Sequence, residues 1–365
     1  MNSNTPSSLT SLDPTRFDRP DILKQLVSAH RHVAELKGVA TSMPNQAILI
    51  STLGLQEAKD SSEIENIVTT HDELYREAAM SEEASSGAAK EVARYREALA
   101  IGYRSVTQTG LLTTNQVLEI QAALEKNRAG LRKLPGTVLQ NSSGQTVYTP
   151  PSPEHLPDLM SELERFINDR DLSASDALIK MALIHHQFET IHPFYDGNGR
   201  TGRIVNVLYL VKEGLLDSPV LYLSRAILRS KSDYYRLLQA VRDNDSWEEW
   251  VLYMLAAVES TAIDAMKTIQ QIKAILFDYK HQIRAKYKFY SQDLINNLFS
   301  HPYTRIDFVQ RDLSVSRLTA TRYLDALTKG GFLDKRKVGR HNYYVNVPLF
   351  KILTREGSTA PANPS

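Results

Sequence analysis

Residues 192–203 read His-Pro-Phe-Tyr-Asp-Gly-Asn-Gly-Arg-Thr-Gly-Arg, and no other part of the sequence is as informative. Residues 197–199 combine two glycines with an asparagine, which reach positive φ easily, so successive backbone N–H groups can converge on an anion where the next helix starts. Arg200 and Arg203 lie one helical turn apart, so both guanidinium groups can reach that anion. The pattern predicts a phosphate-binding turn.

Two other side chains of this stretch predict chemistry beside the phosphate. His192, with a reference pKa of about 6.5, is suited to act as a general base near neutral pH. Asp196 supplies a hard oxygen ligand for one edge of a Mg²⁺ shell completed by phosphate and water. The stretch is not a P-loop, because no Lys-Ser/Thr pair follows the second glycine, and not an EF-hand, because the alternating acidic ligands are missing. A Gly-rich turn alone is often only a helix cap, but His, Asp and two Arg in register around it favour a site.

The composition narrows the class of protein. A chain of 365 residues has room for two or three domains. Its 43 Lys and Arg balance 42 Asp and Glu, so the chain as a whole does not indicate a nucleic-acid or membrane surface. The absence of cysteine excludes disulfides, thiolate metal sites and a Cys nucleophile. No apolar run is long enough to span a bilayer and the N-terminus does not read as a signal peptide, so we expect a soluble, cytoplasmic protein with no membrane partner.

Amphipathic spacing predicts a mainly helical chain. Helices are expected from Pro20 onward and near residues 45–55, 62–80, 88–107, 115–124, 153–168, 174–188, 203–211 and 262–286. Residues 136–151 instead hold two short β-prone runs around a turn-forming Asn-Ser-Ser-Gly, which predicts a small hairpin.

The C-terminal part has a different character. Residues 301–350 hold nine Lys and Arg against four Asp and Glu. Three helical patterns, at 293–299, 306–313 and 316–329, precede two β-prone runs around the basic turn 335–340. This order is typical of a winged helix.

These patterns predict the following domain organisation. The expected parts are a disordered segment 1–16, an N-terminal helical region 17–110, a catalytic domain 111–260, a linker helix 261–290, a winged-helix domain 291–355 and a disordered tail 356–365.

At every fixed position residues 192–203 match the pattern HPFxxGNGRxxR, and the chain therefore resembles the Fic family. The resemblance implies a mainly α fold, a Fic-type helical bundle with a small β-hairpin flap, joined here to a C-terminal winged-helix (α+β) domain. Most Fic proteins transfer AMP from a nucleoside triphosphate to a hydroxyl side chain of a target protein. The resemblance thus implies a protein adenylyltransferase that uses ATP with Mg²⁺ or Mn²⁺ and releases pyrophosphate.

The resemblance also implies roles for individual residues. His192 resembles the base that deprotonates a target Ser, Thr or Tyr hydroxyl, Asp196 resembles the metal ligand, and Phe194 resembles an anchor in the core. The implied ATP- and phosphate-binding residues are Gly197, Asn198, Gly199, Arg200, Thr201, Gly202, Arg203, Tyr234 and Tyr235. The hairpin residues implied to register the target backbone by strand addition are Thr146, Val147 and Tyr148. Homodimers are common in this class.

Residues 60–68 read Asp-Ser-Ser-Glu-Ile-Glu-Asn-Ile-Val and have two interpretations. At a helix start, Ser62-x-x-Glu65 would form a capping box. The run Ser61-x-x-x-Glu65-Asn66 also matches the Fic inhibitory motif (S/T)xxxE(G/N), in the position typical of the class with N-terminal inhibition. In that class the glutamate pairs with the second motif arginine, here Arg203, in the place that the γ-phosphate needs. We therefore expect autoinhibition, and the resemblance also permits removal of AMP with Glu65 orienting water.

Two alternative functions stay open at this point. The winged-helix pattern favours a DNA-binding regulator, with the contacts expected from Arg317, Arg322, Arg336 and Arg340. Winged helices also serve as protein-interaction modules. The other alternative is Fic-type transfer of a different phosphate-containing group, which departures from the motif would favour, and residues 192–203 contain none.

Overall fold

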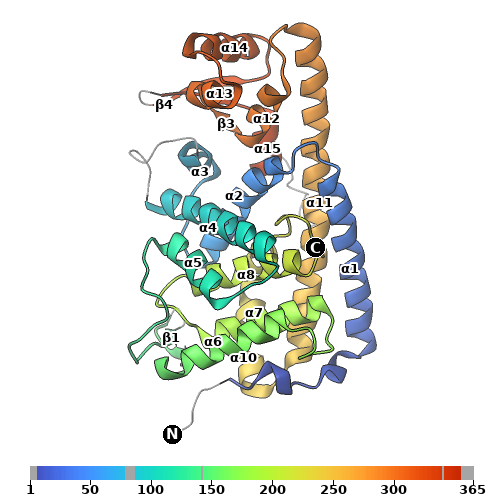
Figure 1. The fold of residues 1–365 in the computed structure, drawn as a ribbon, viewed down its shortest axis with the longest axis vertical. Helices are drawn as coiled ribbons and strands as arrows, with labels where there is room; N and C mark the ends of the chain where they lie inside the picture. Colours follow the sequence, from blue (N-terminus) through green and yellow to red (C-terminus); the bar gives the residue numbers. More distant parts are fainter. Residues whose placement is uncertain (1–5, 79–86, 141–142, 339–340, 355–365) are drawn as a thin grey trace, which may run out of the picture.

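The computed structural model describes residues 6–78, 87–140, 143–338 and 341–354, and most of them are helical (Figure 1). The α-helices before the C-terminal part are α1 (Pro20–Thr41), α2 (Ala47–Ile64), α3 (His71–Ala78), α4 (Gly87–Thr109), α5 (Thr114–Glu125), α6 (Leu156–Asn168), α7 (Ala177–Ile191), α8 (Asn198–Lys212), α9 (Ser224–Arg229), α10 (Lys231–Asn244) and α11 (Trp247–Lys286). Two short 3₁₀ turns, η1 (Leu9–Ser11) and η2 (Pro14–Phe17), precede α1, and a third, η3 (Pro153–His155), directly precedes α6. The expected mainly α fold is confirmed. No helix of these described ranges is long and apolar enough to cross a membrane.

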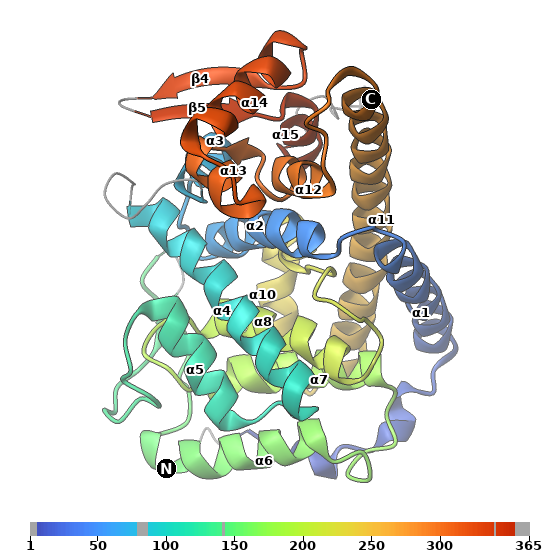
Figure 2. The same ribbon diagram turned by 45° about the horizontal axis from the view of Figure 1, so that its top comes forward.

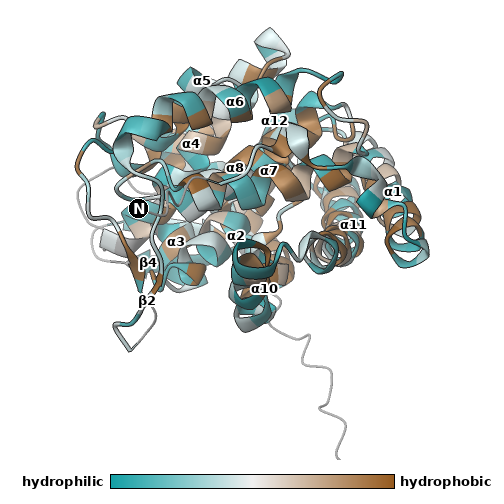
Figure 3. Cartoon of the chain, turned by 90° about the horizontal axis from the view of Figure 1, so that it is seen from below, coloured by the Kyte–Doolittle hydropathy of each residue, from teal (hydrophilic) through white to brown (hydrophobic). Residues whose placement is uncertain are grey.

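The centre of the helical body is formed by α7 and α8. Of the 15 residues of α7, 13 are buried, and 12 of the 15 residues of α8 are buried. Burial on all sides, which here includes polar residues such as Arg200 and Arg203, places both helices inside the bundle with other helices around them. In contrast, peripheral helices such as α1 show both hydrophobic and hydrophilic sides (Figure 3). The predicted phosphate-binding turn is therefore the connection between the two central helices.

The longest element, α11, extends along the molecule beside α1 and reaches from the helical body to the C-terminal part (Figure 1). Our prediction placed a linker helix at 261–290 and ended the catalytic domain before it. The structure shows one continuous helix of 40 residues from Trp247 to Lys286, so that boundary falls inside a helix. Trp250, Met254 and Val258 on its first half are buried, which anchors α11 in the body rather than leaving it as a separate linker.

The N-terminal residues differ from the expectation of a disordered segment 1–16. Residues 6–16 include η1 and most of η2, and Leu9 and Phe17 are buried against the body. Arg16 also pairs with Asp245 and Glu248. Two apolar side chains and one arginine are thus enough to hold a segment whose composition is otherwise polar. Residues 1–5 and the predicted tail 356–365 lie outside the described residues.

The C-terminal unit consists of helices around a three-stranded sheet. Its elements are α12 (Gln292–Ser300), β3 (Tyr303–Thr304), α13 (Ile306–Leu313), α14 (Arg317–Lys329), β4 (Asp334–Val338), β5 (His341–Val345) and α15 (Val347–Thr354). The strand order is β3-β5-β4, antiparallel throughout, with Tyr303 opposite Val345 and Asp334 opposite Val345 on its other side. This order of helices and strands is compatible with the predicted winged helix.

The C-terminal unit packs against α2 and α3 (Figure 2). Tyr75 of α3 is buried and contacts the rings of Tyr303 and Phe350. The hydroxyl of Tyr303 donates a hydrogen bond to Asp72, and the side-chain amide of Gln56 donates one to the carbonyl of Leu353. The helices on both sides of residues 65–70 therefore rest on the C-terminal unit.

The expected hairpin is present next to the helical body. Strands β1 (Leu139–Gln140) and β2 (Thr146–Tyr148) pair antiparallel, and the register shifts between Leu139 and Gln140. Residues 141–142 between them lie outside the described residues. We call residues 139–140 and 143–151 the flap.

Candidate active site

His192 stands at the junction of α7 and the loop that leads to α8. It caps α7 with φ of 48° and ψ of 60°, in the left-handed region that few non-glycine residues occupy. The side chain of Asn198 holds the loop closed, because its Oδ1 accepts from the Phe194 N–H at 2.9 Å and its Nδ2 donates to the Phe194 carbonyl at 2.8 Å. Phe194 itself is fully buried, as predicted. The loop that follows His192 is thus held by a side chain from the first turn of α8.

The start of α8 offers backbone N–H groups to an anion. Gly197 precedes the helix with φ of 77°, and the first-turn N–H groups of α8 have no carbonyl one turn earlier to bond. The Thr201 N–H already donates to the Gly197 carbonyl at 2.9 Å, and the Thr201 side chain is fully buried. The N–H groups free for a phosphate are therefore those of residues 198–200, and Thr201 contributes none.

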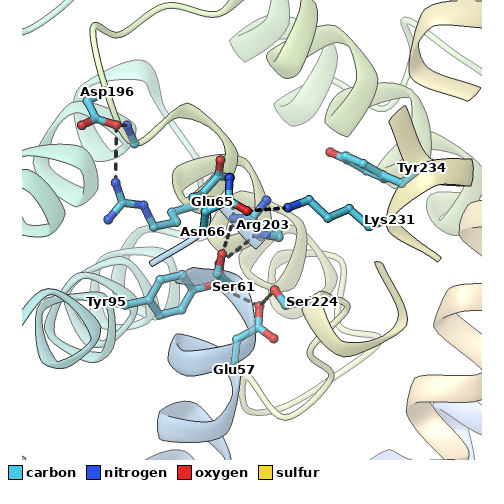
Figure 4. A network of polar contacts seen from close by, with 12 residues as sticks. Glu57, Ser61, Glu65, Asn66, Tyr95, Asp196, Arg203, Ser224, Lys231 and Tyr234 are labelled. Carbon is cyan, nitrogen blue, oxygen red and sulfur yellow. Dashed lines mark hydrogen bonds and ion pairs between the residues drawn. The ribbon is translucent and has the colours of Figure 1, made fainter. Parts of the chain in front are cut away.

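Arg203 is buried and its guanidinium is engaged by the α2 end (Figure 4). Its Nε donates to Ser61 Oγ at 2.8 Å, and its Nη2 donates to the Ser61 carbonyl at 2.9 Å and to Glu65 Oε1 at 2.9 Å. The predicted pair of Glu65 with the second motif arginine is present in the structure. One side of the Arg203 guanidinium thus donates hydrogen bonds to three oxygen atoms: the Ser61 hydroxyl, the Ser61 carbonyl and the Glu65 carboxylate.

Glu65 also covers part of the anion site. A Cβ atom placed on Gly199 would collide with the Glu65 carboxylate, which therefore lies directly against the backbone of the first turn of α8. A carboxylate in this place takes up the same positive surroundings that an anionic ligand would use. The Glu65 side chain is 33% exposed, so it can leave without opening the core.

The local structure around Glu65 corrects the capping-box interpretation. Residues 61–64 belong to the last turn of α2, and Glu65 is its C-cap. Asn66 follows with φ of 64°, its N–H bonds the Glu63 carbonyl, and the Ile67 N–H bonds the Ser62 carbonyl, all at 3.0 Å. This is a Schellman motif, in which the left-handed position favours Gly or Asn. The predicted helix start at residues 60–68 is therefore wrong, because the Ser-x-x-Glu spacing of a capping box occurs here at the end of a helix.

Arg200, the other motif arginine, has three carboxylate partners. It is 2% exposed and pairs with Glu91 of α4, with Glu125 of α5 at 2.9 Å and with Asp196 at 3.4 Å. A Cβ on Gly197 would meet the Glu125 carboxylate, so that position also requires glycine. The sequence predicts phosphate binding for Arg200 as for Arg203. In the structure three carboxylates neutralise the charge of Arg200, so its guanidinium stabilises the turn.

Asp196, the predicted metal ligand, directly precedes the anion site. The Asp196 side chain is 75% exposed, and its Oδ1 accepts from the Gly197 N–H at 2.6 Å. Among the described residues no group of three or more His, Cys, Asp or Glu side chains could hold a metal ion. One exposed carboxylate beside an anion site fits Mg²⁺, which keeps several waters and is bound through one or two carboxylates plus substrate phosphates.

Electrostatics keep His192 neutral. Burial, together with the positive charges of Arg132 and Arg242, lowers the pKa of His192 to about 4, although Glu65 and the Glu189 backbone carbonyl favour the charged form. A neutral imidazole at pH 7 can accept a proton.

Two buried glutamates below the site escaped the sequence-based predictions. Burial raises the pKa of Glu189 to about 7, against the effect of Arg203, and its carboxylate fills the space where a Cβ on Gly202 would stand. Burial likewise raises the pKa of Glu57 to about 7, although Ser224, Arg203 and Tyr95 oppose the change. Nothing in the local sequence marks either residue, because their partners come from other helices.

The tyrosine pair divides into one core and one surface residue. Tyr234 is 2% exposed and its hydroxyl is 2.9 Å from His185 Nε2, so it has no free face for an adenine ring. Tyr235 is 46% exposed and packs edge-on against Tyr234. Of the pair predicted for nucleotide binding, only Tyr235 is accessible. Lys231, one turn earlier, donates to Asn66 Oδ1 at 3.2 Å.

The remaining predicted residues lie at two separate surfaces. Thr146 and Val147 are exposed on the flap, and Tyr148 is partly buried. Arg317 and Arg322 are exposed on α14, at the end of the molecule away from the flap (Figure 1). Arg336 instead pairs with Asp334 at 3.0 Å and lies 3.9 Å from Asp72 of α3, so its charge is partly used within the protein. Arg340 lies outside the described residues.

Three family models match consecutive parts of the chain. They are "Fic/DOC family N-terminal" over residues 23–104, "Fic/DOC family" over residues 111–210 and "Protein adenylyltransferase SoFic-like, C-terminal domain" over residues 276–349. Together they cover well over half of the chain, in the order in which the chain carries Glu65, the motif and the C-terminal unit.

Curated relatives and solved structures agree with these models. Protein adenylyltransferase fic-1 of Caenorhabditis briggsae is 29% identical over 124 residues, which are 33% of this chain and 23% of that protein, and protein adenylyltransferase Fic of Drosophila melanogaster is 34% identical over 98 residues, 27% of this chain and 19% of that protein. The chain thus spans about a quarter or less of the length of these relatives.

Similarity of fold extends further along the chain. A Fic family protein from Desulfovibrio desulfuricans G20 is similar with a TM-score of 0.58 and 19% identity over 90% of this chain and 96% of that one. Fic-1 from C. elegans is similar with a TM-score of 0.53 and 20% identity over 67% of this chain and 71% of that one. With the motif, the central helices that carry it and three consecutive family models all in agreement, this chain belongs to the Fic/DOC family.

Proposed function

We propose that the protein transfers AMP from ATP to a Ser, Thr or Tyr hydroxyl of a target protein or of itself, and that Glu65 inhibits the transfer. The observation that carries the proposal is the junction of α7 and α8, where a neutral histidine stands beside an anion site that holds two arginines. The names of the matching relatives and of the C-terminal family model support adenylyl transfer over transfer of another group.

The geometry suits attack of a hydroxyl oxygen on the α-phosphate. His192 accepts the hydroxyl proton, the oxygen forms a bond to the α-phosphorus, and the bond from that phosphorus to the pyrophosphate oxygen breaks. The free N–H groups of residues 198–200 and the guanidinium of Arg203 are placed to stabilise the negative charge that accumulates on the phosphates. Mg²⁺ or Mn²⁺ held by Asp196 and the phosphates would neutralise more of it.

Inhibition follows from the position of Glu65. Its carboxylate accepts a hydrogen bond from Arg203 and lies against the backbone of Gly199. A triphosphate therefore has to displace the carboxylate before it can contact both residues. The Asn66 turn holds Glu65 in that place without closing the rest of the site.

Labelled ATP tests the proposal. The Glu65→Gly variant, incubated with a cell lysate, is expected to incorporate label from the α-phosphate and none from the γ-phosphate, and Glu65→Gly/His192→Ala is expected to incorporate neither. Incorporation of the γ-label would show phosphate transfer instead. Removal of AMP is a separate hypothesis for the same site: release of label from a modified target by the wild-type chain, lost in Glu65→Gly, would support it.

A second candidate is binding of duplex DNA by the C-terminal unit. The exposed end of α14 favours it, where Arg317 and Arg322 flank Leu318, which is 81% exposed and has no packing role. Affinity for a duplex that falls steeply with added salt, and falls again in Arg317→Met, is expected if phosphates are contacted. No retardation at low salt would exclude this function. A homodimer stays a prediction that the molar mass in solution tests.

A further inference from the structure

Two arginines outside the motif contact the backbone around His192 from opposite sides. Arg132, from the segment before the flap, is 2% exposed. Its backbone N–H donates to the Pro193 carbonyl at 2.9 Å and its Nε donates to the His192 carbonyl at 2.9 Å. Arg242, from α10, donates from Nη2 to the Glu189 carbonyl at 3.3 Å and from Nε to Thr190 Oγ1 at 3.1 Å.

The same two arginines also contact the flap. The Nη2 of Arg132 donates to the carbonyl of Pro151 at the flap end. The guanidinium of Arg242 lies over the ring of Tyr148, 3.9 Å from its centre, and the Tyr148 hydroxyl donates to the Thr190 carbonyl at 3.0 Å. Each arginine therefore joins one point of the flap to one side of residues 189–193.

No ion pair explains the position of either guanidinium group. Within the parts of the chain that the structure describes, no carboxylate forms a salt bridge with Arg132 or Arg242, whereas Arg200 has three such partners. Largely buried positive charge that binds backbone carbonyls instead of carboxylates is costly unless its geometry is needed. The backbone of His192 explains these contacts. It is in the left-handed region, a conformation that surrounding groups have to hold in place.

We propose that Arg132 and Arg242 are positioning residues that hold the flap and the backbone of His192 as one rigid unit. The inference rests on the proposed function: an extended target segment that pairs with the exposed edge of β2 would bring its hydroxyl to the histidine at a fixed distance. Displacement of reacting groups by about 1 Å can lower a rate about a hundredfold.

The charges around the imidazole supply a second readout. The groups that face it are Arg132, Arg242, Glu65 and the backbone carbonyl of Glu189. Removing the charge of Arg132 raises the pKa of His192, so the acid limb of kcat/KM moves to higher pH. A lysine at this position keeps the charge and loses the forked hydrogen bonds.

The test uses the full chain in the Glu65→Gly background, with Arg132→Met, Arg132→Lys and Arg242→Met, and with the exposed Arg128→Met from the same segment as control. Relative to the parent, we expect AMP transfer to fall about tenfold to a hundredfold in the three variants, with the affinity for a non-hydrolysable ATP analogue unchanged within about twofold. The acid limb should move up in Arg132→Met and stay in Arg132→Lys. Arg128→Met should behave as the parent.

A readout without activity separates this inference from the proposed function. Amide hydrogen exchange of residues 143–151 and 189–193 is expected to rise together in Arg132→Met and in Arg242→Met, and in neither segment in Arg128→Met. If the Glu65→Gly parent transfers no AMP, the proposed function fails, while coupled exchange still supports the rigid unit. Exchange that rises in one segment alone, or a parallel loss of melting temperature and ATP affinity with an unmoved acid limb, would overturn the inference.

Discussion

Arg203 and Arg200 lie one turn apart on α8, in the same motif, and have opposite surroundings. Arg203 meets one carboxylate, Glu65, which sits on a turn at the end of another helix and is one-third exposed. Arg200 meets three carboxylates from three segments, and Glu125 among them is 12% exposed. Removing one partner leaves Arg203 without a carboxylate, whereas Arg200 would keep two others, so the Arg203 pair is the simpler one to exchange for a phosphate.

The comparison shows that one motif arginine pairs with a single carboxylate and the other with three. Both residues carry the same charge, so the difference comes entirely from which other elements reach them. Residues 65–66 follow α2 in a turn that contains the left-handed Asn66, while Glu91 lies within α4 and Glu125 is the last residue of α5.

The largest expected effect comes from removing the exchangeable partner. Glu65→Gly frees a charged hydrogen bond of about 1.5–3 kcal/mol, which corresponds to about a tenfold to a hundredfold rise in the initial rate of AMP transfer. Glu63→Gly is the matched control, because Glu63 is on the same turn and pairs with Lys59 rather than with Arg203. Equal rates in the two variants would remove the distinction between the arginines.

The network around Arg200 should respond in stability and not in activation. Glu125→Gln leaves part of a buried arginine without its counter-charge and is expected to lower the free energy of unfolding by about 1–3 kcal/mol in a urea titration. No rise in AMP transfer is expected. A rise comparable to that of Glu65→Gly would mean that Arg200 is inhibited in the same way.

The pH dependence of the activated enzyme sharpens the role of the histidine. Because burial, Arg132 and Arg242 lower the pKa of His192 to about 4, the base is neutral above that pH and protonated below it. In Glu65→Gly the loss of a nearby negative charge lowers this pKa further. We therefore expect kcat/KM to stay level from pH 8 to about pH 5. An acid limb near 6.5, the value of an exposed histidine, would contradict the burial argument.

The smallest expected effect concerns the turn that carries Glu65. Asn66→Ala places a Cβ-bearing residue of poor left-handed tendency at φ of 64° and is expected to cost about 1 kcal/mol, with a severalfold rise in AMP transfer as the turn loosens. Asn66→Gly is the control, since glycine adopts this conformation freely and should leave the rate unchanged. A rate in Asn66→Ala equal to that of wild type would show that the turn does not hold the glutamate.

The sequence alone was sufficient to predict the parts of the site that depend on residues close together in the chain. The motif predicted the turn and the place of Arg203 on the helix that follows, and the resemblance implied the buried Phe194, because all lie within one short stretch of sequence. The order of helices and strands in the C-terminal unit was also visible, since each pattern is local. The pairing of Glu65 with Arg203 came from the family resemblance, as physical spacing alone favoured a capping box.

Long-range partners were beyond reach from the sequence. Sequence alone does not distinguish four charged residues at the site, Glu91, Glu125, Arg132 and Arg242. Only the packing of α4, α5, α10 and the segment after α5 around the junction brings them there. The burial of Tyr234 could not be predicted for the same reason, because it depends on His185 and Trp250 from other helices.

Mass spectrometry after incubation with ATP, Mg²⁺ and a lysate tests the central claim most directly. With Glu65→Gly, the chain itself and its target proteins should gain the mass of one AMP group. With Glu65→Gly/His192→Ala, neither should gain it. A gain that persists without His192, or no gain in Glu65→Gly under any condition in which ATP is bound, would contradict the account.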